Sequence, residues 1–226
     1  MMARAKAERY TSPKGIAVWP RLNEPDTKFK ATGEFSTKLA YEADDAAFLA
    51  LVAKLEGIRD IAFAQFISEN PKKKKTAKVA PVAREELDED GEETGRMTLT
   101  FKMNHKITSK AKGKTYTLTP DIFDALKRPL KNPPNIGGGS TLRVSFEVFP
   151  CFVESAKEFH TSLRMVAVQV IDLVEFGTRD GASYGFDEEE DGFAGSEKQA
   201  AKPEPKSDDS DDDGDGDGDD DGDVDY

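Results

Sequence analysis

The sequence has few of the residues on which disulfide-bonded proteins and metalloproteins depend. Its 226 residues include one cysteine, Cys151, and two histidines, His105 and His160. A lone cysteine cannot form an internal disulfide, which is typical of proteins in a reducing compartment. These three residues show no metal-ligand spacing, so the sequence predicts no metal site, no cofactor and no enzymatic activity.

Long apolar stretches are also missing. The longest, Val166–Phe176, is interrupted by Gln169, Asp172 and Glu175, and it is too short to cross a bilayer. The first ten residues contain no apolar run, so we expect no secretory signal. These absences favour a soluble intracellular protein that does not bind membranes.

Acidic charge is abundant but unevenly distributed. Residues 187–226 contain 19 acidic and 3 basic side chains, whereas residues 1–186 contain 25 acidic and 29 basic ones. Seven of those 25 acids lie between Glu85 and Glu93, and a run of lysines at Lys72–Lys75 precedes them. We therefore predict a basic domain over residues 1–186, with a flexible loop at about 71–95, and a disordered acidic tail over residues 187–226.

Alternation of apolar and polar residues predicts a mainly β domain. The predicted strands are residues 15–20, 32–42, 96–104, 114–119, 141–150 and 163–176. In the strand at 96–104, Met97, Leu99 and Phe101 fall on one face and Lys102 on the other. Such a set of strands predicts an antiparallel barrel or a sandwich.

One long segment has helical rather than strand spacing. Apolar residues between Asp44 and Glu69 recur every three or four positions, which predicts an amphipathic helix. Asp44 or Asp45 is suited to cap its first turn, and Asn70-Pro71 to end it. A second, short helix is predicted to begin at Pro120.

Residues Pro133–Ser140, with the sequence PPNIGGGS, allow two interpretations. Three consecutive glycines permit positive φ angles and close approach of another backbone or of a nucleic acid. They are equally suited to a flexible connection between strands. No Gly-Lys-Ser/Thr follows, so the segment is not a nucleotide-binding P-loop.

Basic and aromatic side chains interleave along the predicted strands. Single-stranded nucleic acid is bound by this mixture, because cations neutralise phosphates and flat rings stack on bases. Charges on the outer face of a strand are also commonly only solvated, and most aromatic residues of β proteins belong to the core. The pattern by itself leaves both interpretations open.

A set of features in a fixed order resembles the single-stranded DNA-binding proteins of short-tailed bacteriophages. It consists of a long helix, a lysine-rich and acidic middle loop, the segment IGGGSTLRVSFEVFP at Ile136–Pro150, and an acidic tail that ends in an aromatic residue. The resemblance implies an OB-fold-like, antiparallel five-stranded barrel with one long packed helix and a disordered acidic C-terminal tail. It further implies binding, protection and annealing of single-stranded DNA during phage replication, recombination and repair, in the cytoplasm of the infected host.

The resemblance also implies particular residues and partners. Lys102 and Arg143 match basic positions of the family, whereas Asn104 and Cys151 replace an expected lysine and an expected aromatic residue, so that Phe152 is expected to stack on DNA. The expected DNA-binding residues are Lys14, Trp19, Lys28, Lys30, Lys102, Lys106, Arg143, Phe149 and Phe152. The tail, through Asp219, Asp220, Asp221, Asp223, Asp225 and Tyr226, is expected to compete for the DNA cleft and to contact the phage DNA polymerase and helicase–primase. A homodimer is implied as well.

Two other functions are compatible with the composition. In a chaperone for basic proteins, the acidic tail would bind the ligand and the β domain would be its scaffold. In a metal-dependent nuclease, paired carboxylates of the domain would carry the chemistry.

Overall fold

The computed structural model describes residues 8–28, 30–88, 90–109 and 113–175. The chain divides into a unit over residues 1–179 and a second unit over residues 180–226. The predicted acidic tail, with Asp219–Tyr226, therefore lies outside the described residues. Within the described part of the chain, no helix is long and apolar enough to cross a membrane.

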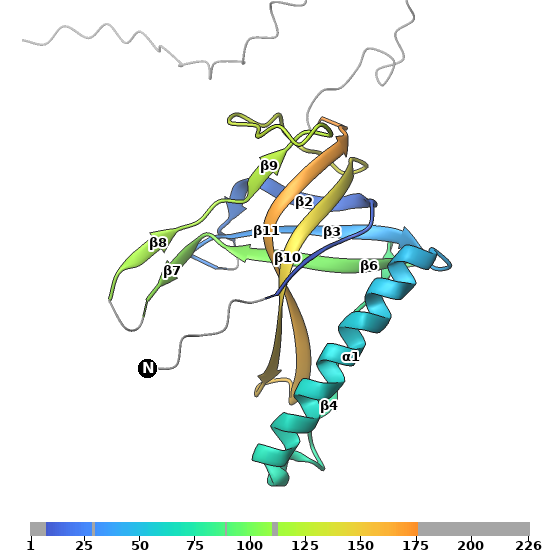
Figure 1. Ribbon diagram of the computed structural model, residues 1–226, viewed down its shortest axis with the longest axis vertical. Coiled ribbons are helices and arrows are strands. Elements are labelled where there is room, and N and C mark those ends of the chain that lie inside the picture. Colours follow the sequence, from blue (N-terminus) through green and yellow to red (C-terminus); the bar gives the residue numbers. More distant parts are fainter. Residues whose placement is uncertain (1–7, 29, 89, 110–112, 176–226) are drawn as a thin grey trace, which may run out of the picture. The chain divides into compact units, whose positions relative to one another are not determined.

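Five strands of the first unit close into a ring (Figure 1). They are β2 (Gly15–Asp26), β3 (Glu34–Glu42), β6 (Glu93–Asn104), β10 (Thr141–Val153) and β11 (Glu158–Asp172). Hydrogen bonds join them in the order β10–β2–β3–β6–β11, and β11 pairs again with β10. This confirms the predicted OB-type barrel.

The barrel differs from the prediction in one pairing, because β6 and β11 run parallel. The other four pairings of the ring are antiparallel. A closed ring with an odd number of strands cannot alternate direction all the way round. One parallel pair is therefore a geometric necessity of the five-stranded barrel.

Inward-facing side chains fill the barrel, as the alternation predicts. Leu39, Leu99, Phe101 and Phe146 are at most 2% exposed, and the rings of Phe101 and Phe146 lie 5.1 Å apart. Successive side chains of a strand point to opposite faces. Their polar neighbours, Lys38 and Lys102 among them, must therefore face outward from the barrel.

Strand β2 is longer than predicted, because it continues through Pro20 instead of ending there. Val18 pairs with Lys38 and Arg21 with Ser36, so β2 has one more residue than β3 between these pairs. This bulge contains Trp19 and Pro20. A bulge tolerates proline, since the extra residue donates no ladder hydrogen bond.

Helix α1 (Ala46–Glu69) confirms the predicted helix. The Asp45 carboxylate accepts a hydrogen bond of 2.7 Å from the Phe48 N–H, and Pro71 follows the last turn. The helix and the ends of β10 and β11 run together beyond the barrel (Figure 1), where Phe66 stacks on Phe152 with ring centroids 4.7 Å apart. We call this extension the arm. The start of α1 packs into the barrel core through Phe48 and Leu55, whereas aromatic contacts hold the part of the arm beyond it.

Two segments differ from the prediction. The expected helix at Pro120 is instead β9 (Asp121–Phe123), which pairs in parallel with β11. The segment 71–95, predicted as a flexible loop, contains η1 (Pro71–Lys73), β4 (Lys78–Val79), β5 (Arg84–Leu87) and the start of β6. Both segments find a hydrogen-bonding partner in a strand distant in sequence, which no local pattern reveals.

The remaining strands lie outside the ring. β1 (Arg9–Thr11) pairs with β10. β7 (Lys106–Thr108) and β8 (Thr115–Thr117) form a separate two-stranded ribbon that projects from the barrel (Figure 1). The glycine-rich segment connects β9 to β10 and packs along β2, where Gly139 donates to the Ala17 carbonyl at 2.9 Å.

Candidate nucleic-acid interface

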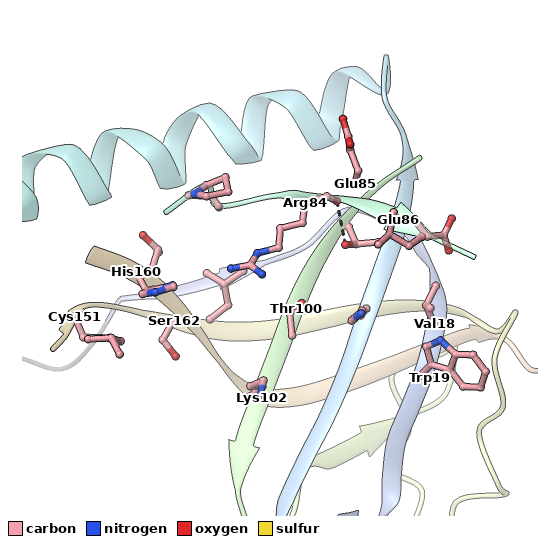
Figure 2. Close-up of a pocket in the computed structure, with 18 residues that line it drawn as sticks. Val18, Trp19, Arg84, Glu85, Glu86, Thr100, Lys102, Cys151, His160 and Ser162 are labelled. Atoms are coloured by element: carbon pink, nitrogen blue, oxygen red, sulfur yellow. Dashed lines mark hydrogen bonds between the residues drawn. The ribbon is translucent and has the colours of Figure 1, made fainter. Parts of the chain in front are cut away.

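A hollow of about 720 Å³ lies on the outer face of the barrel across β3 and β6 (Figure 2), and three smaller ones are described below. We call it the main hollow. It is lined by Val18, Trp19, Lys38, Pro81, Val82, Arg84, Glu85, Glu86, Leu87, Thr98, Thr100, Lys102, Cys151, Val153, His160, Thr161, Ser162 and Leu163. In chain order β3 and β6 are the second and third strands of the ring, and the outer face of these strands is where OB folds bind oligonucleotides.

The floor of the main hollow is built by the outward residues of β3 and β6. Lys38 pairs with Thr100, and Ser36 pairs with Lys102, so these side chains share one face. Lys38 and Lys102 are both exposed. Two lysines and a threonine thus extend from the same outward face of β3 and β6.

Strand β5 supplies one wall of the main hollow. Figure 2 shows Arg84 reaching from β5 over the floor, between Trp19 at one end and His160 and Cys151 at the other. Thr98 of β6 fixes the backbone of β5 by donating to the Arg84 carbonyl at 3.1 Å. The Arg84 side chain has no acidic partner within ion-pair distance among the described residues.

The wall is anchored by a carboxylate that is 7% exposed, Glu86. Arg96 donates to both of its oxygens, at 2.6 and 2.9 Å, and the Thr94 hydroxyl donates at 2.6 Å. Burial pushes the pKa of Glu86 upward, but the hydrogen bonds from Thr94 and Arg96 outweigh it and leave the pKa below its ordinary value. Glu86 therefore stays ionised and paired, and its charge is neutralised where it borders the main hollow.

Trp19 stands at the edge of the main hollow. Its side chain is 65% exposed, and its backbone φ of 50° lies in the left-handed region. A bulky residue seldom occupies that region, and such residues are commonly found at binding sites. The bulge of β2 turns the indole ring out to solvent, where one of its faces is available for stacking.

Lys102 and Lys30 are tied to one carboxylate. Lys102 Nζ lies 2.8 Å from one oxygen of Glu34, and Lys30 Nζ lies 3.6 Å from the other. Lys30 also donates to Asn104 at 2.5 Å. The structure thus brings two of the sequence-predicted lysines together beside Glu34, an acid that would compete with phosphates for both of them.

Arg143 lies outside the main hollow. It lines a hollow of about 450 Å³ together with Arg9 and Lys127, which we call the Arg143 hollow. A third hollow of about 420 Å³, the Arg164 hollow, lies between them, because it shares Lys102 with the main hollow and Asp121 with the Arg143 hollow. Lys102 and Arg143 therefore border neighbouring hollows on connected faces of the barrel rather than one cleft.

The other predicted residues are dispersed. Among the described residues, Lys14, Lys28 and Lys106 line none of the four hollows. Phe152 packs in the arm against Phe66, with Lys73 Nζ 4.5 Å from its ring centroid. Phe152 thus lies in the arm and away from the main hollow, and its stacking on DNA stays a prediction.

Phe149 is covered by a residue that the sequence analysis missed. The guanidinium of Arg164 lies 3.8 Å from its ring centroid, and Arg164 pairs in register with Lys102. Arg84 and Lys38 were also absent from the expected set. No sequence spacing connects these residues, because the parallel β6–β11 pairing and the β5–β6 pairing bring them together.

Comparison with known proteins now decides the family. A sequence model of the family described as "Single-stranded DNA-binding protein, Bacteriophage T7" matches residues 15–173, which include all five strands of the ring. The chain belongs to this family. The family is one of non-catalytic proteins, so the prediction of no enzymatic activity is confirmed and the nuclease alternative is wrong.

Two relatives of this T7-type family extend the comparison. The single-stranded DNA-binding protein of Enterobacteria phage T3 is 25% identical over 215 residues, which are 90% of this chain and 92% of that protein. The crystal structure of gp2.5, a single-stranded DNA-binding protein encoded by bacteriophage T7, matches with a TM-score of 0.64 and 21% identity. That match covers 84% of this chain and 100% of the T7 chain, and it supports the fold.

Proposed function

We propose that this protein binds single-stranded DNA across the main hollow during phage DNA replication and recombination, and that it protects and anneals the strands. The observation that carries the proposal is the convergence of Lys38, Arg84 and Lys102, from three strands, beside the exposed ring of Trp19. The names of the T3 and T7 relatives support it, since both are single-stranded DNA-binding proteins.

The chemistry of the main hollow suits one strand rather than a duplex. Three cations can neutralise successive phosphates, and base stacking on an aromatic ring contributes about 1–3 kcal/mol per base. Unpaired bases are needed for that stacking, because the bases of a duplex present only their edges in the grooves. We therefore expect affinity for single strands to exceed affinity for duplex DNA.

We further propose that the acidic tail competes with DNA for this surface. The last 19 residues, Asp208–Tyr226, contain 12 aspartates and imitate the charge spacing of a nucleic acid. A flexible chain of about 40 residues spans roughly 35 Å, compared with a radius of gyration near 16 Å for a domain of this size. On DNA binding the tail is released to the phage DNA polymerase and helicase–primase, with Tyr226 as its terminal aromatic, in a protein that acts as a homodimer.

One titration tests the DNA-binding proposal. Labelled oligo(dT) is titrated with the wild type and with Lys102→Glu and Arg84→Glu, with duplex DNA in parallel. Each reversal is expected to weaken binding and to lower the slope of log K against log salt by about 0.7 for every phosphate that is no longer neutralised. Lys72→Glu is the matched control, since Lys72 is an exposed lysine of η1, in the arm.

The same titration distinguishes the DNA-binding proposal from the chaperone alternative. A chaperone for basic proteins keeps its ligand binding when charges of the β domain are reversed, because its tail carries the interaction. Unchanged oligo(dT) affinity in both reversal variants would contradict the main hollow as the DNA site.

A further inference from the structure

The glycine-rich segment and the bulge of β2 enclose a fourth hollow next to the main hollow. It has a volume of about 580 Å³ and is lined by residues 19–24 of β2 and residues 135–138. We call it the glycine-loop hollow. Trp19 lines both it and the main hollow, so the two meet at the indole ring.

The wall formed by residues 133–138 is held in place by hydrogen bonds. The Asn23 amide donates to the carbonyls of Pro133 and Pro134, at 3.2 and 2.8 Å, and its oxygen accepts from the Ile136 N–H at 3.1 Å. Gly137 donates to the Val174 carbonyl at 2.7 Å. A loop pinned at this many points is a preformed surface rather than a flexible connection.

Of the two exposed glycines in the triplet, the backbone conformation requires glycine at position 139 but not at position 138. Gly139 has a φ of +90°, which side chains disfavour. Gly138 has no such angle, and a Cβ placed there would meet only the Ala17 carbonyl oxygen, at an ordinary 3.8 Å. The protein itself could accommodate an alanine at this exposed position.

The surface around Gly138 has the groups that a DNA backbone requires. Within the described part of the chain no acceptor takes the Gly138 N–H, which leaves it free to donate to a phosphate oxygen. Arg21 lines the same hollow and is exposed, without an acid at ion-pair distance among the described residues. Glu24 also borders this hollow, so the positive charge is concentrated at the Arg21 end.

We infer that single-stranded DNA leaving the main hollow passes over Trp19 and continues through the glycine-loop hollow, with a phosphate held by Arg21 and the Gly138 N–H. Gly138 has no side chain because the strand lies against it. This inference rests on the proposed function, since it extends the same binding surface. It assigns the glycine triplet a role in setting the length of DNA that one domain covers.

Oligonucleotide length separates the two hollows. OB folds cover about 4–16 nucleotides each, so fluorescence titrations use oligo(dT) of about 4 and about 16 nucleotides on the full chain. Arg21→Glu and Gly138→Ala are expected to lower affinity for the longer strand roughly threefold to tenfold, and affinity for the shorter strand less than about twofold. Trp19→Ala is expected to weaken both lengths, because its ring borders both hollows.

A matched control shows whether Gly138→Ala lowers affinity by obstructing the DNA or by destabilising the fold. Gly57→Ala adds the same methyl group at an exposed position of α1 with no atom within 4 Å, and it is expected to leave binding unchanged. Thermal unfolding checks that Gly138→Ala retains the wild-type midpoint.

Each outcome decides one of the two proposals. If Lys102→Glu weakens both lengths while Arg21→Glu and Gly138→Ala change neither, the path is overturned and the main hollow stands. The path is also overturned if Arg21→Glu and Gly138→Ala lower the affinity for both lengths equally, because only the longer strand should reach the glycine-loop hollow. If Lys102→Glu and Arg84→Glu change neither length, the proposed function itself fails.

Discussion

At the scale of single residues, the most consequential contact is that of Glu34 with Lys102, which lines the main hollow, and with Lys30, a sequence-predicted DNA contact outside it. Its carboxylate holds Lys102 at 2.8 Å and Lys30 at 3.6 Å. An exposed ion pair contributes only about 0.2–1 kcal/mol. If the proposed DNA contact is made, we therefore expect phosphates to displace Glu34 at small cost and Glu34 to limit the affinity for DNA.

Removing this acid should strengthen DNA binding. Glu34→Gln is expected to raise the affinity for oligo(dT) about twofold to fivefold at low salt, because both lysines lose their competitor. The gain should shrink as salt screens the charges. Fluorescence titration at two salt concentrations measures it, with Glu69→Gln at the end of α1 as the control. Equal or weaker binding by Glu34→Gln would remove Lys102 and Lys30 from the DNA contact.

Tyr41 is expected to make the stability of the domain depend on pH. The residue is 4% exposed and stacks on Phe48 at 4.8 Å. Burial raises the pKa of its hydroxyl from 10 to about 12, so the folded state favours the neutral form. The stability is complete below pH 10 and falls as the pH rises through 12, because unfolding then permits ionisation.

Substitutions can test whether this fall in stability comes from the Tyr41 hydroxyl. The free energy of unfolding is expected to decrease by about 2–3 kcal/mol between pH 10 and 12 from Tyr41 alone. Tyr41→Phe should flatten that part of the profile, whereas Tyr116→Phe, at a tyrosine that is 41% exposed, should not. Urea unfolding at several pH values measures both. Parallel profiles for wild type and Tyr41→Phe would contradict the assignment.

At the scale of elements, β5 is attached to β6 by backbone pairing and by the ion pair between the buried Glu86 and Arg96. Arg96→Ala leaves the buried Glu86 carboxylate without its bidentate partner, and we expect the free energy of unfolding to fall by about 1–3 kcal/mol. Amide hydrogen exchange over residues 84–87 should accelerate, and DNA affinity should fall because Arg84 loses its support. The double variant Arg96→Ala/Glu86→Gln should recover part of both. Unchanged exchange in Arg96→Ala would show that β5 is held by its backbone hydrogen bonds alone.

The arm is a second element whose stability and function can be separated. Phe152 contacts Phe66, which also packs on Phe159 at 5.4 Å. Phe152→Ala is expected to destabilise the domain by about 1–3 kcal/mol, since the ring is only half-buried. Thermal unfolding reports that loss, while oligo(dT) affinity should change less than about twofold. If Phe152→Ala instead lost much of its affinity for oligo(dT) without being destabilised, Phe152 would be a direct DNA contact.

At the scale of the whole molecule, charge is divided between a basic domain and an acidic tail. Deleting residues 208–226 removes 12 aspartates. The affinity for single strands is expected to rise several-fold at low salt, because the tail acts at a millimolar effective concentration, and the difference should vanish at high salt. A tail of equal length made of glycine and serine is the control. Titration with oligo(dT) that detects no gain on deletion contradicts the competition.

Local patterns of the sequence determined the core strands, the helix and the division of charge. Alternation at residues 96–104 and helical spacing at residues 44–69 are signals within one element, and burial of one face enforces them. The sequence also predicted Trp19 and Lys102 as DNA contacts, and both line the main hollow. Residue type suggested them, since rings and cations are what single strands bind, but it left a purely structural role open.

Only the tertiary structure decided which of these residues meet. The closure of an odd-numbered ring places Arg164 beside Lys102, and the buried Glu86–Arg96 pair fixes Arg84 over the floor of the main hollow. The same closure assigns Arg143 to a separate hollow, and Phe152 packs against Phe66 in the arm. Strand pairing joins residues far apart in the chain, so its consequences are not encoded in any local spacing.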